Sequence, residues 1–252
     1  MGTVTIYCIR FRLGAIVSPM ARQARIVLPG VAHHVTQRGN YRQDVFFTDD
    51  DRRVYLSFLR ESAQRHGLAV SAYCLMTNHV HLVVTPEREE SLASTMGRTH
   101  LMYAQYIHRL HGRLGHLWQS RFYSCPMDEN YAHNATAYVE LNPVRAAMTA
   151  LAWDHAWSSA AAHCGEGGDP ARLLDLGAWF EEMPAAKWKA TLVAIADSGP
   201  EVDLLRLHTR TGRPLGSDSF LSKVETYLGR RVRAIPRGRP HGSRDRVRRK
   251  RR

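Results

Sequence analysis

Two kinds of spacing between apolar positions run through the first 150 residues of the chain. In short runs, apolar and polar residues alternate as in a strand with one buried face. In longer runs, apolar residues recur every three to four positions, as on one face of a helix. Glycine, asparagine and proline separate the runs. The pattern predicts strands over 30–37, 68–74, 79–85 and 118–125, and helices over 48–66, 91–110 and 130–141.

The predicted elements follow one another as strand, helix, strand, strand, helix, strand, helix. This order is typical of an α+β sandwich in which helices pack on an antiparallel sheet. Beyond residue 150 a glycine-rich stretch over 164–170 precedes helical patterns over 173–180, 185–196 and 217–228. We divide the chain into an N-terminal arm (1–19), an α+β domain (20–150), a helical C-terminal region (151–228) and a disordered basic tail (229–252). The arm is either disordered or an extension upstream of a natural start at Met20.

The positive charge of the chain is concentrated at its end. The whole chain has a formal net charge of +12 and a sequence pI of about 10.0. The tail over 229–252 contains eleven Arg and one Lys against a single Asp, which leaves a net charge of about +1 for the other 228 residues. Such a tail indicates a polyanionic partner, with nucleic acid favoured over an anionic membrane.

Neither the cysteines nor the apolar runs indicate a secreted or membrane protein. Cys8, Cys74, Cys125 and Cys164 lie far apart without a C-x-x-C pair, which argues against a zinc knuckle and a disulfide framework. Hydrophobic residues make up 44% of the chain, enough for a core, but no segment has the length of a membrane span. Arginines also interrupt the N-terminal apolar run before it reaches signal-peptide length, so we expect a cytoplasmic protein.

Two histidines alternate with a valine in the predicted strand 79–85. Because residues i and i+2 of a strand point to one face, His79 and His81 present their imidazoles side by side while Val80 faces the other way. Such a pair can chelate a divalent ion, leave coordination positions open and so polarise a phosphoryl oxygen. Taken alone, the pattern also fits two surface histidines on an amphipathic strand.

A tyrosine and an asparagine share one face of the last predicted helix of the α+β domain. Tyr138 and Asn142 are four residues apart in the sequence Tyr-Val-Glu-Leu-Asn-Pro-Val-Arg, which ends at Arg145. A tyrosine hydroxyl can attack a phosphodiester, an amide oxygen can ligate a metal, and a guanidinium can hold a phosphate. The alternative is a half-buried aromatic residue followed by an ordinary helix C-cap before Pro143.

Together, the two motifs resemble those of a known family. Asn-His-Val-His, followed about sixty residues later by Tyr-Val-x-x-Asn-Pro-Val-Arg, is similar to the single-tyrosine HUH transposases and most similar to the REP-associated tyrosine transposases. The stretches 33–40, 75–78 and 117–123 support the resemblance, which covers roughly residues 21–157. The joint pattern is more specific than either motif and favours the functional interpretation of both.

The resemblance implies a ferredoxin-like α+β sandwich and a metal-dependent reaction on single-stranded DNA. His79 and His81 would match the family's metal-binding pair, with Asn142 as the third ligand and Tyr138 as the nucleophile. The enzyme would cleave DNA at hairpins of palindromic repeats in the bacterial nucleoid, form a covalent 5′-phosphotyrosine and rejoin the strand without ATP. The metal would be Mg²⁺ or Mn²⁺, and imidazole ligands favour Mn²⁺.

Further residues are expected to contact DNA from a turn after the first strand, from the motif regions and from the tail. These residues are Arg38, Asn40, Arg42, Arg121, Arg145, Arg237 and Arg239. In the tail, Arg-Gly-Arg-Pro over 237–240 resembles the core of an AT-hook, which inserts arginines into a narrow minor groove. The partner would be single-stranded or hairpin DNA and not a membrane, bound by a monomer or a homodimer.

Three other functions remain compatible with the motifs. Replication initiators and relaxases share the paired histidines, although they are usually larger and the Asn-Pro context argues against them. A domesticated transposase that binds hairpins without catalysis would be indifferent to the loss of Tyr138. An unrelated metal hydrolase would need a carboxylate base or further ligands close to the histidines, and none is evident in the sequence.

Overall fold

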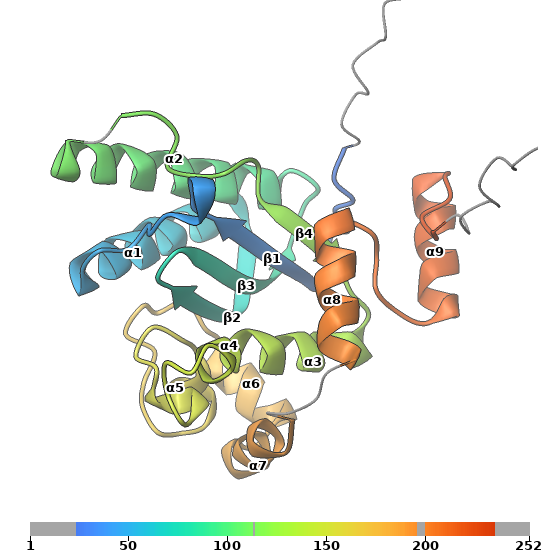
Figure 1. The fold of residues 1–252 in the computed structure, drawn as a ribbon. Helices are drawn as coiled ribbons and strands as arrows, with labels where there is room; N and C mark the ends of the chain where they lie inside the picture. Colours follow the sequence, from blue (N-terminus) through green and yellow to red (C-terminus); the bar gives the residue numbers. More distant parts are fainter. Residues whose placement is uncertain (1–23, 113, 196–199, 235–252) are drawn as a thin grey trace, which may run out of the picture.

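A four-stranded antiparallel sheet lies at the centre of the molecule (Figure 1). The computed structural model describes residues 24–112, 114–195 and 200–234. The strands are β1 His33–Arg38, β2 Leu68–Met76, β3 His79–Pro86 and β4 Tyr123–Pro126, and they lie in the order β2-β3-β1-β4. With α1 after β1 and α2 after β3, the chain follows the β-α-β-β-α-β order of a ferredoxin-like fold, which confirms the predicted class.

Helices α1 (Asp49–His66) and α2 (Ser91–His111) cover one face of the sheet. The strands direct alternate residues such as Val35, Leu82 and Val84 to this face, and all three are fully buried in the core beneath the helices. The alternation seen in the sequence therefore separates two faces with different surroundings.

The sequence at both ends of α1 sets its length. Thr48 and Asp51 form a capping box, in which the Thr48 hydroxyl accepts from the backbone N–H of Asp51 and the Asp51 carboxylate accepts from that of Thr48. Gly67 ends the helix with a φ of 67°, a left-handed conformation that side chains disfavour. The helix predicted over 48–66 is confirmed.

Helices α3 (Glu129–Glu140) and α8 (Pro200–Thr211) cover the opposite face, which we call the second face. Val83 of β3 packs there in one cluster with Leu205 of α8. Because side chains alternate along a strand, His81 lies on the same face as Val83. The second face therefore carries the candidate chemistry, and helix α8 of the C-terminal region helps to enclose it.

The other helices are short, and most follow residue 150. They are η1 Asn40–Arg42, α4 Asn142–Arg145, η2 Ala152–Asp154, α5 Ala160–His163, α6 Leu176–Glu182, α7 Ala185–Ile195 and α9 Asp218–Leu228. Helix α7 packs on the end of α3, where Trp188 is buried with Leu141. Helix α9 packs on the segment before β1, where Val224 is buried with Ile26.

A buried carboxylate joins α3 to the C-terminal helices. Glu140 is fully buried at the end of α3 and accepts hydrogen bonds from Ser159 Oγ at 2.5 Å and from His163 Nδ1 at 2.6 Å. Trp188 Nε1 donates to its other oxygen at 2.8 Å. Three donors compensate for the desolvation of this carboxylate, so the network fixes α5 and α7 against α3.

Glu140→Ala is expected to lower the free energy of unfolding by about 3–5 kcal/mol, because three buried donors lose their shared acceptor. Chemical denaturation followed by circular dichroism measures the change. Glu181→Ala, at an exposed position of α6, is the control and should change the stability by less than about 0.5 kcal/mol. If the Glu140 variant proved as stable as the control, the network would make no net contribution to folding.

The prediction of a strand over 118–125 is wrong in its first half. β4 begins only at Tyr123, and Trp118 makes a single bridge with Gly39. The indole Nε1 of Trp118 donates to the carbonyl of His100 on α2, so burial of this large ring among the helices outweighs continuation of the strand. Helix α8 is absent from the predicted elements, because a Gly-Pro break at 199–200 obscures the apolar spacing that follows.

The cysteines and the apolar segments can be compared with the sequence-based predictions only within the described residues. Cys74, Cys125 and Cys164 are buried free thiols. Within the described ranges, no helix has both the length and the apolar character needed to cross a bilayer. The arm over 1–19 and the tail residues Arg237 and Arg239 lie outside the described residues.

Candidate active site

Two histidines of β3 form the centre of the site. The rings of His79 and His81 have centroids 4.9 Å apart on the second face. Nδ1 of His79 lies 2.6 Å from Asn78 Oδ1, and Nδ1 of His81 lies 3.0 Å from His34 Nε2. Because Asn78 Oδ1 only accepts, His79 carries its proton on Nδ1 and keeps the lone pair of Nε2. Burial and the charge of Arg38 lower the pKa of His79 to about 4, so this ring is neutral at neutral pH.

A buried chain of hydrogen bonds orients His81. His34 on β1 contacts His81 through Nε2, and its Nδ1 lies 2.7 Å from Oγ1 of Thr209 on α8. Burial lowers the pKa of His34 to about 3, and burial, together with the electrostatic effect of the neighbouring His79 imidazole, lowers the pKa of His81 well below 6.5. When His81 donates from Nδ1 to His34, and His34 donates from Nδ1 to Thr209, Nε2 of His81 keeps its lone pair for a metal.

Tyr138 of α3 is buried directly against this histidine group. Its ring meets those of His34 and His81 edge to face, with centroid distances of 5.4 and 5.5 Å. Its hydroxyl accepts a hydrogen bond from Nε of Arg206 on α8 at 3.3 Å. The guanidinium of Arg145 lies 4.6 Å from the ring centroid. One guanidinium therefore contacts the tyrosine hydroxyl and another lies over its ring, and both are groups that can bind a phosphate.

Asn142 follows Tyr138 by one helical turn. Its Nδ2 donates to the backbone carbonyls of Tyr138 at 2.9 Å and of Val139 at 3.2 Å, which fixes the amide plane. Its Oδ1 accepts no hydrogen bond within the described ranges and stays available as a ligand. The chain then forms the single helical turn α4. Pro143 is compatible with this turn, because the backbone N–H that proline lacks would have no hydrogen-bond partner in the first turn of a helix. That turn brings Arg145 back to the carbonyl of Tyr138, to which it donates.

These side chains line one cavity of about 540 Å³, which we call the active-site cavity. The sequence predicts six of its lining residues: Arg38, His79, His81, Tyr138, Asn142 and Arg145. The rest are His34, Thr36, Met76, Gln119, Tyr123, Ala146, Arg206, Thr209 and Arg210. One chain thus brings a candidate nucleophile, paired imidazoles and several guanidinium groups into the same space.

A match to a family profile decides the identity of this region. Residues 28–142 match the profile described as "Transposase IS200 like". Residues 28–142 form an IS200-like transposase domain. The matched stretch contains His79, His81 and Tyr138 and ends at Asn142, so the transposase family expected from the two motifs is confirmed.

Two solved structures are similar to this transposase. One, described as a REP-associated tyrosine transposase bound to a REP hairpin, has 18% identity and a TM-score of 0.48, over 60% of this chain and 90% of that chain. The other, described as a transposase from Deinococcus radiodurans R1, has 21% identity and a TM-score of 0.34, over 47% of this chain and 95% of that chain. These scores are too low to add to the family match. No curated protein sequence matches the chain.

Three predicted DNA contacts of the transposase lie outside the active-site cavity. Asn40 and Arg42 belong to η1, where Arg42 has a left-handed φ of 61°. The carbonyl of Arg42 accepts a hydrogen bond from Asn78 Nδ2 at 3.0 Å, which connects this turn to the side chain that orients His79. Arg121 is exposed in the loop before β4 and lines a different cavity.

The donors of the active-site cavity fit a divalent metal. Two neutral imidazole nitrogens and one amide oxygen form a partial ligand set that leaves positions open for a substrate. Among the described residues, no group of three or more His, Cys, Asp or Glu side chains is placed to hold a metal. Asn142 lines the same cavity as His79 and His81, where its amide oxygen could serve as a further donor. This donor set suits Mn²⁺ better than Mg²⁺.

No sequence motif marks three residues of the site: His34, Arg206 and Thr209. His34 lies in a stretch that supports the family resemblance, but its role depends on the pairing of β1 with β3. Arg206 and Thr209 come from α8, 68 and 175 residues away from the side chains that they contact. No local sequence pattern marks contacts over such separations.

Thr209→Val is expected to weaken Mn²⁺ binding by about 10-fold or more, because valine keeps the shape but removes the oxygen that orients His34 and, through it, His81. Isothermal titration of Mn²⁺ into the DNA-free transposase measures the affinity. Thr211→Val, at the exposed end of α8, is the control and should bind as the wild type does. An unchanged affinity in the Thr209 variant would contradict a positioning role for this hydrogen-bond chain.

Proposed function

We propose that this transposase cleaves and rejoins single-stranded DNA at hairpins of palindromic repeats, with Tyr138 as the nucleophile. The observation that carries the proposal is the contact of Tyr138 with His81 inside one cavity. A phosphate in that cavity would be within reach of the hydroxyl and of a metal held by the imidazoles. The resemblance of the two motifs to those of the REP-associated tyrosine transposases supports the substrate class.

The reaction transfers a phosphate ester bond from DNA to the protein and back. Tyr138 Oη forms a bond to the scissile phosphorus while the bond from phosphorus to O3′ breaks. The phenol proton passes to water, and the departing O3′ takes up a proton to become a free 3′-hydroxyl. The product is a 5′-phosphotyrosine. Attack by a 3′-hydroxyl reverses these bond changes and releases Tyr138, so the cycle needs no ATP.

The other residues of the cavity position the reacting groups. Mn²⁺ or Mg²⁺ would be held by His79, His81 and Asn142, and when bound it supplies positive charge beside a non-bridging phosphate oxygen. Arg145 and Arg206 flank the nucleophile, where their guanidinium groups would hold the remaining phosphate oxygens. Holding the phosphate on three sides favours in-line attack by the tyrosine hydroxyl.

A single copy of the chain contains every residue that we assign to the reaction. The proposed mechanism therefore operates in a monomer and equally in each copy of a homodimer. Its substrate would be chromosomal DNA that folds into hairpins when single-stranded, which corresponds to action at the bacterial nucleoid.

A cleavage assay tests the proposal. Hairpin oligonucleotides from palindromic repeats of the host genome, labelled at the 3′ end, are incubated with the protein and Mn²⁺, Mg²⁺ or EDTA. We expect a covalent protein–DNA adduct that forms only with metal. Tight hairpin binding without an adduct, on substrates that vary the flanking sequence on both sides, would instead indicate a hairpin-binding protein without catalytic activity.

A further inference from the structure

A second cavity of about 780 Å³ adjoins the active-site cavity. The two cavities share Gln119, Tyr123, Thr209 and Arg210, so they lie side by side next to the edge strand β4. The walls of the second cavity come from four separate stretches of chain: 24–26, 119–124, 209–213 and 230–233. We call this cavity, with its many arginines, the arginine groove.

The positive charge of the arginine groove is not offset by carboxylates in its lining. Arg121, Arg210, Arg213, Arg230 and Arg231 line it with exposed side chains, and none of the lining residues is Asp or Glu. Within the described part of the chain, none of these five side chains forms an ion pair. Several unpaired guanidinium groups around one groove form a surface suited to a chain of phosphates.

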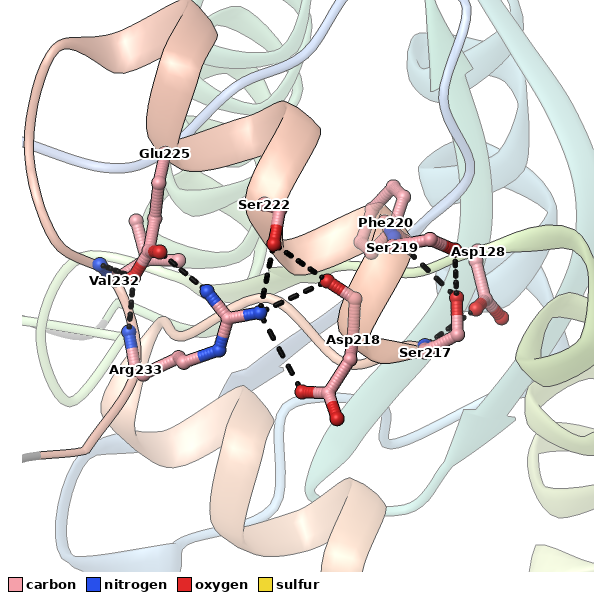
Figure 2. Close-up of polar contacts among 9 residues, drawn as sticks. All are labelled: Asp128, Ser217, Asp218, Ser219, Phe220, Ser222, Glu225, Val232 and Arg233. Atoms are coloured by element: carbon pink, nitrogen blue, oxygen red, sulfur yellow. Dashed lines mark hydrogen bonds and ion pairs between the residues drawn. The ribbon is translucent and has the colours of Figure 1, made fainter.

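The wall that carries Arg230 and Arg231 is held in place by α9 (Figure 2). The Glu225 carboxylate accepts hydrogen bonds from the backbone N–H of Val232 at 2.9 Å and of Arg233 at 3.2 Å, and it pairs with the Arg233 guanidinium. That guanidinium also donates to a backbone carbonyl and a serine hydroxyl of α9. Arg233 is therefore engaged in fixing the wall, which presents Arg230 and Arg231 in advance of any ligand.

An exposed aromatic ring stands where the two cavities meet. Tyr123 at the start of β4 is 43% exposed and lines both cavities. In the lining of the groove, Arg25 stacks on Phe122, and burial together with the charge of Arg121 lowers the pKa of Arg25 to about 10. A basic groove that follows a backbone, with an aromatic ring on which a base can stack, is typical of sites for single-stranded nucleic acid.

We propose that the arginine groove binds the sugar–phosphate backbone of the single-stranded DNA that flanks the scissile phosphate, with one base stacked on Tyr123. The inference rests on the proposed function, because that function places the scissile phosphate in the active-site cavity. The flanking strand then leaves past Tyr123 into the groove, and Arg210, which lines both spaces, contacts the phosphate at the junction. Stacking on Tyr123 requires an unpaired base, which favours a single strand over the hairpin stem.

The test measures DNA binding without cleavage, in a Tyr138→Phe background. Fluorescence anisotropy compares two hairpins that differ only in a single-stranded extension of about 12 nucleotides. Combined replacement of Arg213, Arg230 and Arg231 by Ala should weaken binding of the extended hairpin about 10-fold or more. The slope of log affinity against log salt should become shallower by about 2, as expected for three lost phosphate contacts. Affinity for the hairpin without the extension should stay within about 2-fold.

Two sets of control variants test base stacking on Tyr123 and the effect of removing positive charge elsewhere on the surface. Tyr123→Ala should weaken binding of the extended hairpin by about 10-fold, whereas Tyr123→Phe keeps the ring and should restore it. Replacement of Arg53, Arg65 and Arg109, three exposed arginines of α1 and α2, removes the same charge on the opposite face and should have little effect.

Two outcomes would overturn the inference. Equal losses on both hairpins would assign the groove to the duplex stem, and no loss on either hairpin would leave the groove without a role in DNA binding. Because the assay measures DNA binding and not cleavage, its results can be interpreted even if the wild type forms no covalent adduct.

Discussion

Tyr138→Phe is expected to abolish the covalent protein–DNA adduct and to lower the rate of strand cleavage by at least about 10³-fold, a loss typical of removing a nucleophile. Phenylalanine keeps the ring that packs against His34 and His81, so the hairpin should still bind. Only the hydroxyl and its hydrogen bond from Arg206 are lost. The 3′-labelled fragment, which carries the 5′-phosphotyrosine, reveals the adduct on a denaturing gel.

Tyr131→Phe is the matched control, because Tyr131 lies two turns earlier on α3 and packs in the same cluster as Tyr138. It does not line the active-site cavity, so its variant should cleave DNA nearly as well as the wild type. Tyr123, which lines the cavity, is the other rival, and its replacement by Phe should also leave the adduct in place. An adduct that survived in Tyr138→Phe and disappeared in either rival variant would move the nucleophile to that tyrosine.

His81→Ala is expected to lower cleavage by at least about 10²-fold and to abolish measurable Mn²⁺ binding. The substitution removes one imidazole ligand, leaves His34 without its buried partner and opens space against Tyr138. His79→Ala should have a similar effect on cleavage with less disturbance of the fold, because His79 is less buried. Cleavage rates over a range of Mn²⁺ concentrations, together with calorimetric titration, measure both effects.

His116→Ala serves as the control for loss of a histidine, since His116 is exposed in the loop after α2. It should bind Mn²⁺ and cleave DNA at wild-type levels. Circular dichroism would verify that each variant is folded. Full cleavage by a folded His81 variant in the presence of EDTA would rule out the metal role that we assign to this histidine pair.

The local part of the candidate site can be predicted from the sequence, because it depends on the periodicity of single elements. The period of a strand places His79 and His81 on one face, and the period of a helix places Tyr138 and Asn142 one turn apart. That the two pairs meet follows from the packing of α3 on the sheet, which the family resemblance suggested and the periodicity alone did not.

The remainder of the site depends on contacts that no local pattern contains. Thr209 reaches His34 only because α8 packs on the second face, and that packing depends on apolar residues after an apparent break in the chain. The position of Arg145 could not be predicted from the local sequence pattern either. The motif indicates a phosphate contact, but the extra turn of α4 first brings its guanidinium over the ring of Tyr138.

The position of α8 limits which segments of this protein can be exchanged with those of a relative. The stretch that matches the family profile ends at residue 142, yet the active-site cavity is completed by Arg206 and Thr209. The same helix buries Val202 and Leu205 against the sheet. A chimera that took its last third from a relative would replace residues that line the cavity and residues of the core in one step. The C-terminal segment of this chain is therefore not expected to be exchangeable as an independent module.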